Sequence, residues 1–291
     1  MVGGNVLGPS GRDQCRGAHV ACRRGERPCI FRTGCRPTQL GGMAFVARAN
    51  YRTGVQGGAV PGKAVAIVQS NYVPWKGYFD LMNSVDEFIL YDDAQYTRRD
   101  WRNRNRIKTP HGAQWMTIPV LVKGRYHQRI NETVVSDGSW ARDHWDRLSH
   151  SYGRAVHFRA YREVVREWYE AAGRQSFLSQ VNHTFLCGIF ELLGIRARIT
   201  WSMDYELADG RTERLVGLCK QARAGTYVSG PAARAYLDES LFAAEGIDVR
   251  YIDYGGYPEY PQPFPPFEHA VTVLDLLFST GPDAPRYMKS F

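Results

Sequence analysis

The chain has 291 residues, a hydrophobic content of 44% and a net charge of +8. No window approaches the roughly 18 uncharged apolar residues that a membrane span needs, so the composition indicates a soluble globular protein. Residues 1–62 hold nine arginines, no lysine and two acidic residues, a net +7, which leaves +1 for residues 63–291. This distribution argues against nucleic acid as a partner of the main part of the chain.

Residues 1–62 are rich in glycine and arginine and lack apolar periodicity, which predicts a disordered tail. A second hypothesis is that translation begins at Met43. The four tail cysteines lack the paired spacing of zinc sites, and we predict no metal site. Cys187 and Cys219 lie in apolar helical patterns, where cysteine is usually a small buried hydrophobe. With no secretory signal at the start of the chain, we expect a cytoplasmic protein.

The first regular elements form a βαβ unit. An apolar strand is predicted over 64–69, a short helix over about 79–85 and a second apolar strand over 87–92. Two continuous apolar strands joined by a helix are normally parallel. The loop after the first strand carries Asn71, Pro74, Trp75, Gly77 and Tyr78. Ligands of open α/β sheets bind where strands feed helix N-termini, so this loop is a candidate site.

The polar stretch 95–108 leads through a turn signal at 109–112 into the apolar run 115–122, a pattern typical of a hairpin. Residues 130–135 are predicted as a short strand. Apolar residues at three- and four-residue spacing then predict three central helices, over 140–151, 159–172 and 176–193.

A second region in which predicted strands alternate with predicted helices follows. Its prolines exclude regular structure over 257–266. The predicted strands are 198–203, 226–229 and 249–253, and the predicted helices are 213–222, 231–244 and 271–278.

Arginines alternate with asparagines from Arg102 to Arg106. On a strand, Arg102, Arg104 and Arg106 would share one face, and guanidinium groups bind phosphate or carboxylate bidentately. The alternative is a solvent-exposed edge ribbon whose charges prevent aggregation. However, asparagine has a low strand propensity, and Trp101 would bury little apolar surface at an exposed edge. RNA binding through this basic and aromatic segment is a less favoured interpretation.

Three further positions are candidates. Asp92 and Asp93 follow a strand and could hold Mg²⁺ or a ribose hydroxyl, or serve only as a turn or cap. Ser229 and Gly230 precede a predicted helix whose free N–H groups could bind an anion, or they form an ordinary strand-to-helix turn. His144 is a candidate base, although lone histidines are more often structural.

These segments resemble the WbqC-like family of bacterial proteins. The resemblance spans about residues 64–281 and includes Gln69-Ser-Asn-Tyr-Val-Pro-Trp-Lys-Gly-Tyr-Phe79, where the family usually has Pro at the position of Ser70. Further matching segments are Asp92-Asp-Ala-Gln-Tyr96, Arg99-Asp-Trp-Arg-Asn-Arg-Asn-Arg-Ile-Lys108, Ser229-Gly-Pro-Ala-Ala233, Tyr260-Pro-Gln262 and Val273-Leu-Asp-Leu-Leu277.

The resemblance implies a role in O-antigen or other surface-polysaccharide biosynthesis. We therefore expect a single α/β domain over 63–291, with a mainly parallel, Rossmann-like (nucleotidyltransferase-like) sheet and a helical insertion. The expected activity is transfer on a nucleotide-activated amino sugar, including ATP- and Mg²⁺-dependent aminoacyl (glycyl) transfer. The alternative is a non-catalytic protein that binds nucleotide or glycan.

The candidate catalytic residues are Asp92, Asp93, Arg104 and His144. The candidate substrate-binding residues are Gln69, Asn71, Tyr72, Trp75, Gly77, Tyr78, Gln95, Arg99, Asp100, Trp101, Asn103, Asn105, Lys108, Ser229, Gly230 and Gln262.

Overall fold

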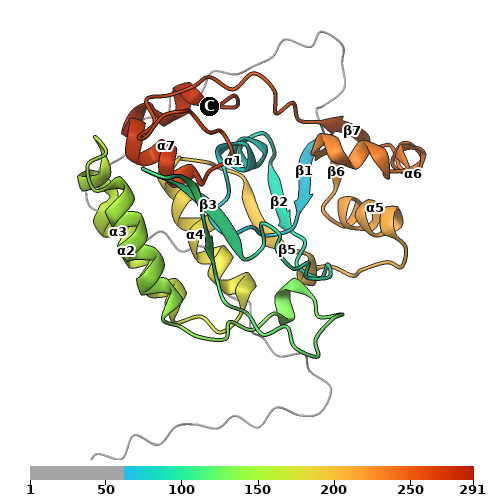
Figure 1. Cartoon of the computed structure of the whole chain (residues 1–291). Coiled ribbons are helices and arrows are strands. Elements are labelled where there is room, and N and C mark those ends of the chain that lie inside the picture. Colours follow the sequence, from blue (N-terminus) through green and yellow to red (C-terminus); the bar gives the residue numbers. More distant parts are fainter. Residues whose placement is uncertain (1–61) are drawn as a thin grey trace, which may run out of the picture. The chain divides into compact units, whose positions relative to one another are not determined.

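The computed structural model describes residues 62–291 (Figure 1). The predicted disorder of the tail, the start at Met43 and the four tail cysteines lie outside these residues. Within them, no helix is long and apolar enough to cross a membrane.

Five parallel strands form the central sheet, as the alternation of strands and helices predicts. Their order is β5-β2-β1-β6-β7, so β1 lies at the centre with β2 on one side and β6 on the other. The chain first adds β2 and β5 on one side of β1 and then adds β6 and β7 on the other side. The loops that follow β1 and β6 therefore leave neighbouring strands in opposite directions, and ligands of open α/β sheets bind at such a position. The strands are β1 (Lys63–Val68), β2 (Glu87–Leu90), β5 (Arg198–Trp201), β6 (Ala224–Ser229) and β7 (Asp248–Tyr251).

Helices cover both faces of the sheet because the apolar strand residues alternate between them. Val65 and Ile67 of β1 pack against α5 (Arg211–Gln221) and α6 (Glu239–Ala244). On the opposite face, α1 (Lys76–Asn83) places Tyr78 against Phe88 of β2, with ring centroids 5.3 Å apart.

The predicted central helices are present as α2 (Trp140–Tyr152), α3 (Phe158–Gly173) and α4 (Leu178–Leu192), inserted before β5. They pack in chain order, and α3 also contacts the C-terminal helix α7 (Val273–Thr280) (Figure 1). The predicted hairpin is the antiparallel pair β3 (Arg104–Thr109) and β4 (Gly112–Thr117). Residues 257–266 contain no helix or strand, as their prolines predict.

The strand predicted over 130–135 is wrong. The segment begins with the 3₁₀ turn η1 (Ile130–Glu132), followed only by isolated bridges at Val134 and Val135. Two local hydrogen bonds close this turn. The Glu132 carboxylate accepts from the Arg129 N–H at 2.9 Å, and the Thr133 hydroxyl donates to the Arg129 carbonyl at 2.8 Å.

The single helix predicted over 231–244 is also wrong. The chain forms the 3₁₀ turn η3 (Pro231–Ala235) and then starts α6 separately. Asp238 begins the new helix because its carboxylate caps the Ser240 N–H at 3.0 Å. Two further 3₁₀ segments are η2 (Ser202–Asp204) and η4 (Gly281–Tyr287).

Candidate functional site

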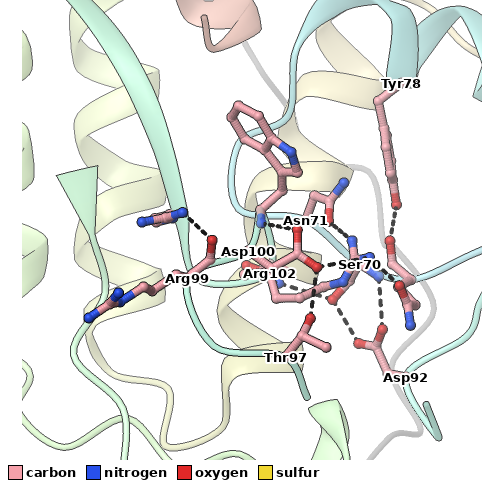
Figure 2. A network of polar contacts seen from close by, with 12 residues as sticks. Ser70, Asn71, Tyr78, Asp92, Thr97, Arg99, Asp100 and Arg102 are labelled. Atoms are coloured by element: carbon pink, nitrogen blue, oxygen red, sulfur yellow. Dashed lines mark hydrogen bonds and ion pairs between the residues drawn. The ribbon is translucent and has the colours of Figure 1, made fainter. Parts of the chain in front are cut away.

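The loop after β1 is held by an arginine from the start of the β3–β4 ribbon. The Arg102 guanidinium donates to the side-chain oxygens of Gln69 and Asn71 (Figure 2). The Tyr72 N–H also donates to the Trp101 carbonyl at 3.0 Å. Arg102 therefore turns toward the sheet and does not share a face with the other ribbon arginines, because β3 begins only at Arg104.

Asp92 holds the same loop in place through hydrogen bonds to Ser70. Its carboxylate accepts the Ser70 N–H at 2.8 Å and the Ser70 hydroxyl at 2.7 Å. Asn182 of α4 donates to the Ser70 hydroxyl at 3.0 Å and to the Arg102 carbonyl at 2.9 Å. Asp92 is fully buried, and this burial raises its pKa above the ordinary aspartate value. The geometry gives Asp92 a role in positioning the loop.

Asp93 also interacts with other side chains of the protein. Its carboxylate accepts from the Ser202 hydroxyl at 2.6 Å, from Asn131 at 3.4 Å and from Arg129 at 3.3 Å. The residue is 9% exposed. Within residues 62–291, no group of three or more His, Cys, Asp or Glu side chains is arranged to hold a metal ion.

A pocket of about 230 Å³ opens beside this loop. Two indoles and two side-chain amides contribute to its wall, so four predicted site residues, two from the loop and two from the 98–108 segment, lie on one cavity. The lining residues are Asn71, Pro74, Trp75, Trp101, Asn105, His269 and Ala270.

Trp75 is held in the pocket wall by its neighbours. Its ring packs edge-on against Tyr254 at 5.3 Å and Tyr257 at 5.4 Å between centroids. The indole also lies over the first turn of α1, where a Cβ on Gly77 would come within 2.4 Å of the ring. Gly77 therefore permits the close approach of Trp75 to the helix.

Asn105 supports the loop as well as lining the pocket. Its amide donates to the carbonyls of Tyr72 at 3.1 Å and Val73 at 2.6 Å. Val73 has a φ of +39°, an unusual conformation for a β-branched residue, and these bonds hold the backbone at that position.

The outer face of the ribbon combines cations and indoles. Arg104 stacks over the Trp115 ring at 4.1 Å, and Arg106 lies 5.7 Å from it. Trp115 in turn packs against Trp101 at 5.2 Å, and each indole is 39% exposed. Arg104 also donates to the Arg99 carbonyl. This basic and aromatic surface adjoins the pocket through Trp101.

His269 is a pocket residue that sequence reasoning missed. It lies in the irregular segment after the prolines, where no periodicity or motif marks it. Arg106 connects this segment to the ribbon, since its Nε donates to the Ala270 carbonyl at 2.9 Å. Long-range contacts of this kind bring His269 to the pocket.

Tyr72 and His144 belong to the buried core between the loop and the inserted helices. The Tyr72 hydroxyl is 2.9 Å from His144 Nδ1 and 2.9 Å from the Tyr169 hydroxyl. Burial, together with the charge of Arg147, lowers the pKa of His144 to about 4. His144 is therefore neutral at pH 7 and does not line the pocket formed by the loop.

Several other predicted residues hold backbone segments. The Tyr78 hydroxyl donates to the Gln69 carbonyl at 3.1 Å, and Asn103 donates to the Ile118 carbonyl at 2.8 Å. Asp100 accepts from its neighbours, the Thr97 hydroxyl and the Trp101 N–H, each at 2.7 Å.

Two predicted residues lie at the surface. Gln95 donates to the Tyr126 carbonyl at 3.0 Å, and Arg99 has a φ of +60°. The Arg99 carbonyl, rather than its guanidinium, makes the contact with Arg104.

Lys108 and Gln262 meet around a buried carboxylate on α7. Asp275 accepts from Gln262 at 2.8 Å and from the hydroxyls of Tyr152 and Tyr260 at 2.6 Å. Lys108 donates to the Pro266 carbonyl. These two predicted residues therefore anchor the irregular segment that carries His269.

Ser229 is the last residue of β6, and Gly230 follows it. The predicted helix N-terminus is missing there because only the 3₁₀ turn η3 follows. The Ser229 hydroxyl accepts from Tyr227 at 3.3 Å. A Cβ on Gly230 would make ordinary contact with Tyr254 at 3.8 Å. Neither residue lines the pocket beside the β1 loop.

Comparisons with known proteins agree with the quoted motifs. The model of the WbqC-like protein family matches residues 69–287. The chain is 53% identical over 227 residues to the uncharacterized protein Rv1507c of Mycobacterium tuberculosis (strain ATCC 25618 / H37Rv), covering 78% of this chain and 98% of that protein. No solved structure matches the chain.

Proposed function

Because the chain belongs to the WbqC-like protein family, we propose that it is a transferase that binds a nucleotide-activated amino sugar and acts in surface-polysaccharide biosynthesis. The proposed site is the pocket beside the β1 loop, and the reaction would take place in the cytoplasm. Transfer of an activated aminoacyl group, with ATP and Mg²⁺, is the more specific form of this proposal.

The observation that carries the proposal is the pocket between Trp75 and Trp101, with the amides of Asn71 and Asn105 in its wall. Small-molecule sites are typically apolar hollows with a few fixed polar groups, and this pocket has that composition. Indoles supply flat apolar faces, and the Asn71 side-chain nitrogen can donate to a hydroxyl group of the ligand, whereas the Asn105 amide holds the loop that shapes the pocket.

The neighbouring arginines supply the charge that a diphosphate needs. Arg104 lies over Trp115, whose ring packs on the pocket residue Trp101. A planar guanidinium can bind phosphate bidentately while one face remains on an aromatic ring. The nucleotide phosphates would then lie on the ribbon and the sugar in the pocket.

The strand order supports the Rossmann-like part of the proposal. Counting only the five strands of the sheet, β5-β2-β1-β6-β7 corresponds to the order 3-2-1-4-5 of doubly wound nucleotide-binding folds. In such folds ligands bind near the first strand, where the order reverses, and the β1 loop forms one wall of the present pocket.

The second candidate function is non-catalytic binding of a nucleotide or glycan. It is favoured by one observation, namely that Asp92 and Asp93 direct their carboxylates to protein groups. An accessory protein would bind the same ligand in the same pocket without converting it.

Thermal unfolding of the full-length chain tests the proposal, with UDP-N-acetylglucosamine, ATP with Mg²⁺ and a short RNA as separate additions. A ligand at about 100 times its dissociation constant stabilises by about 2.7 kcal/mol, which raises the midpoint by several degrees. We expect this rise with the sugar nucleotide, its loss in Trp101→Ala and its retention in Tyr126→Ala, which changes a 75% exposed aromatic outside the pocket.

A rise with RNA alone would favour RNA binding, and no rise with a panel of sugar nucleotides would contradict the proposal. Turnover distinguishes the transferase from the accessory protein: a sugar transferase releases UDP, and an aminoacyl transferase releases AMP or ADP from ATP while the nucleotide stays on the sugar.

A further inference from the structure

His269 is the only ionisable side chain among the residues that line the pocket. It is exposed, and its ring packs edge-on against Phe267 with centroids 4.6 Å apart. Within residues 62–291, neither ring nitrogen has a hydrogen-bond partner. The imidazole can therefore exchange a proton with a molecule in the pocket, which the hydrogen-bonded carboxylates of Asp92 and Asp93 are not placed to do.

The backbone on both sides of His269 is fixed. On one side, Gln262 donates to the Glu268 carbonyl at 3.0 Å and accepts the Glu268 N–H at 2.8 Å. On the other side, Arg106 donates to the Ala270 carbonyl at 2.9 Å and lies 3.4 Å from the Glu268 carboxylate. The held backbone and the packing on Phe267 orient the imidazole, while its ring nitrogens stay available to a molecule in the pocket, as proton transfer requires.

Further backbone contacts place this segment over the β1 loop. The Thr272 N–H donates to the Arg106 carbonyl at 3.0 Å, and the Val273 N–H donates to the Pro74 carbonyl at 2.9 Å. The segment that carries His269 is thus joined both to the ribbon and to the loop that holds Trp75.

We propose that His269 is the general base of the transfer reaction, an inference that rests on the proposed function. The acceptor hydroxyl or amine loses its proton to a ring nitrogen of His269 as its oxygen or nitrogen bonds to the activated carbon of the donor. The bond from that carbon to the phosphate oxygen breaks, and the nucleotide phosphate leaves with the electron pair. Imidazole suits this step because it gains and loses a proton near neutral pH.

The test compares His269→Gln with His111→Gln, which changes an exposed histidine in the β3–β4 turn. Calorimetry measures binding of UDP-N-acetylglucosamine. Turnover is followed from pH 5 to 9 as release of UDP with water and with a panel of amine and sugar acceptors, and as release of AMP or ADP when ATP, Mg²⁺ and an amino acid are supplied. We expect His269→Gln to bind within about threefold of the wild type and to lose a factor of about 100 or more in turnover. Added imidazole should restore part of the turnover in His269→Gly.

The outcomes distinguish the role of His269 from the transferase and accessory-protein functions. Loss of turnover and of the acidic limb of the pH profile in His269→Gln alone would support the general base. Equal turnover in His269→Gln and wild type would overturn the role of His269 and leave the transferase intact. Binding without turnover by the wild type would overturn the general base and favour the accessory protein. Absence of binding by the wild type with all sugar nucleotides would overturn both proposals.

Discussion

The carboxylate of Asp92 accepts two hydrogen bonds from Ser70, one from its N–H at 2.8 Å and one from its hydroxyl at 2.7 Å. A proline at this position would have neither of these donors. This pair joins the ends of the adjacent strands β1 and β2, and through it the second strand determines where the first loop begins.

We expect Asp92→Ala to destabilise the protein by roughly 2–4 kcal/mol, because both buried Ser70 donors would lose their acceptor. Urea unfolding measures this change. Asp209→Ala, which removes an exposed carboxylate, should stay within about 0.5 kcal/mol of the wild type. Equal stability of the two variants would contradict the positioning role of Asp92.

Because Trp75 lies so close to α1, adding a methyl group at Gly77 should displace its indole ring. In Gly77→Ala the new Cβ would meet the Trp75 ring at 2.4 Å, so the indole must leave the pocket wall. We expect a lower midpoint of thermal unfolding and loss of sugar-nucleotide binding.

The matched control for this variant is Gly217→Ala in α5, where the nearest atom to a new Cβ is 3.7 Å away. Alanine is the better helix former, so this variant should be neutral or stabilised by up to about 1 kcal/mol. Full binding by Gly77→Ala would show that the position of Trp75 is not needed for the ligand.

The buried histidines predict a pH dependence of stability. Burial lowers the pKa values of His144 and His183 to about 4, below the value of about 6.5 in an unfolded chain. The unfolded state then binds more protons as the pH falls. The stability is fully present above about pH 6.5 and is lost toward pH 4, by up to about 1.4 kcal/mol per pH unit for each histidine.

Urea unfolding between pH 7.5 and 4.5 measures this slope. His144→Gln should reduce it, because glutamine does not titrate and can still accept a hydrogen bond from Tyr72. His150→Gln, on the exposed side of the same helix, should leave the slope unchanged. An identical slope in His144→Gln and wild type would show that burial does not lower the pKa of His144.

The β1 loop could be predicted from sequence because its signals are local. An apolar run ends in polar residues and is followed by Pro74, Trp75 and Gly77 at the start of a helix. The strand predicted over 130–135 was wrong because Ile130, Val134 and Val135 imitate a strand pattern, whereas bonds within the turn decide its backbone.

The proton-transfer candidate could not be predicted in this way. His269 reaches the pocket through Arg106, which is separated by 164 residues from its partner Ala270. A lone histidine in an irregular segment carries no periodicity, and nothing in the sequence pairs the two segments. The role of Asp92 could not be predicted for the same reason. Its position at a strand end was expected, but its long-range hydrogen bonds to Ser70 were not.

The last prediction concerns how Arg104 would bind phosphate. Its guanidinium carbon lies 4.1 Å from the centroid of the Trp115 ring, and the guanidinium donates to the Arg99 carbonyl, so two contacts hold it before a ligand arrives. A lysine would keep the charge but neither the stacking nor the paired donors. We expect UDP-N-acetylglucosamine to bind about tenfold more weakly to Arg104→Lys and about 100-fold more weakly to Arg104→Ala, measured by calorimetry at constant salt.

Arg142→Lys is the matched control, because Arg142 is an exposed arginine on α2 that pairs with Asp146 at 3.8 Å and lies outside the pocket. Full affinity in Arg104→Lys beside a loss in Arg104→Ala would mean that charge alone binds the phosphate. That interaction should then weaken as salt is raised from 0.15 to 0.5 M, where the Debye length falls from about 8 Å to a few ångströms. Full affinity in both variants would remove Arg104 from the phosphate site and leave only the pocket between Trp75 and Trp101 to account for binding.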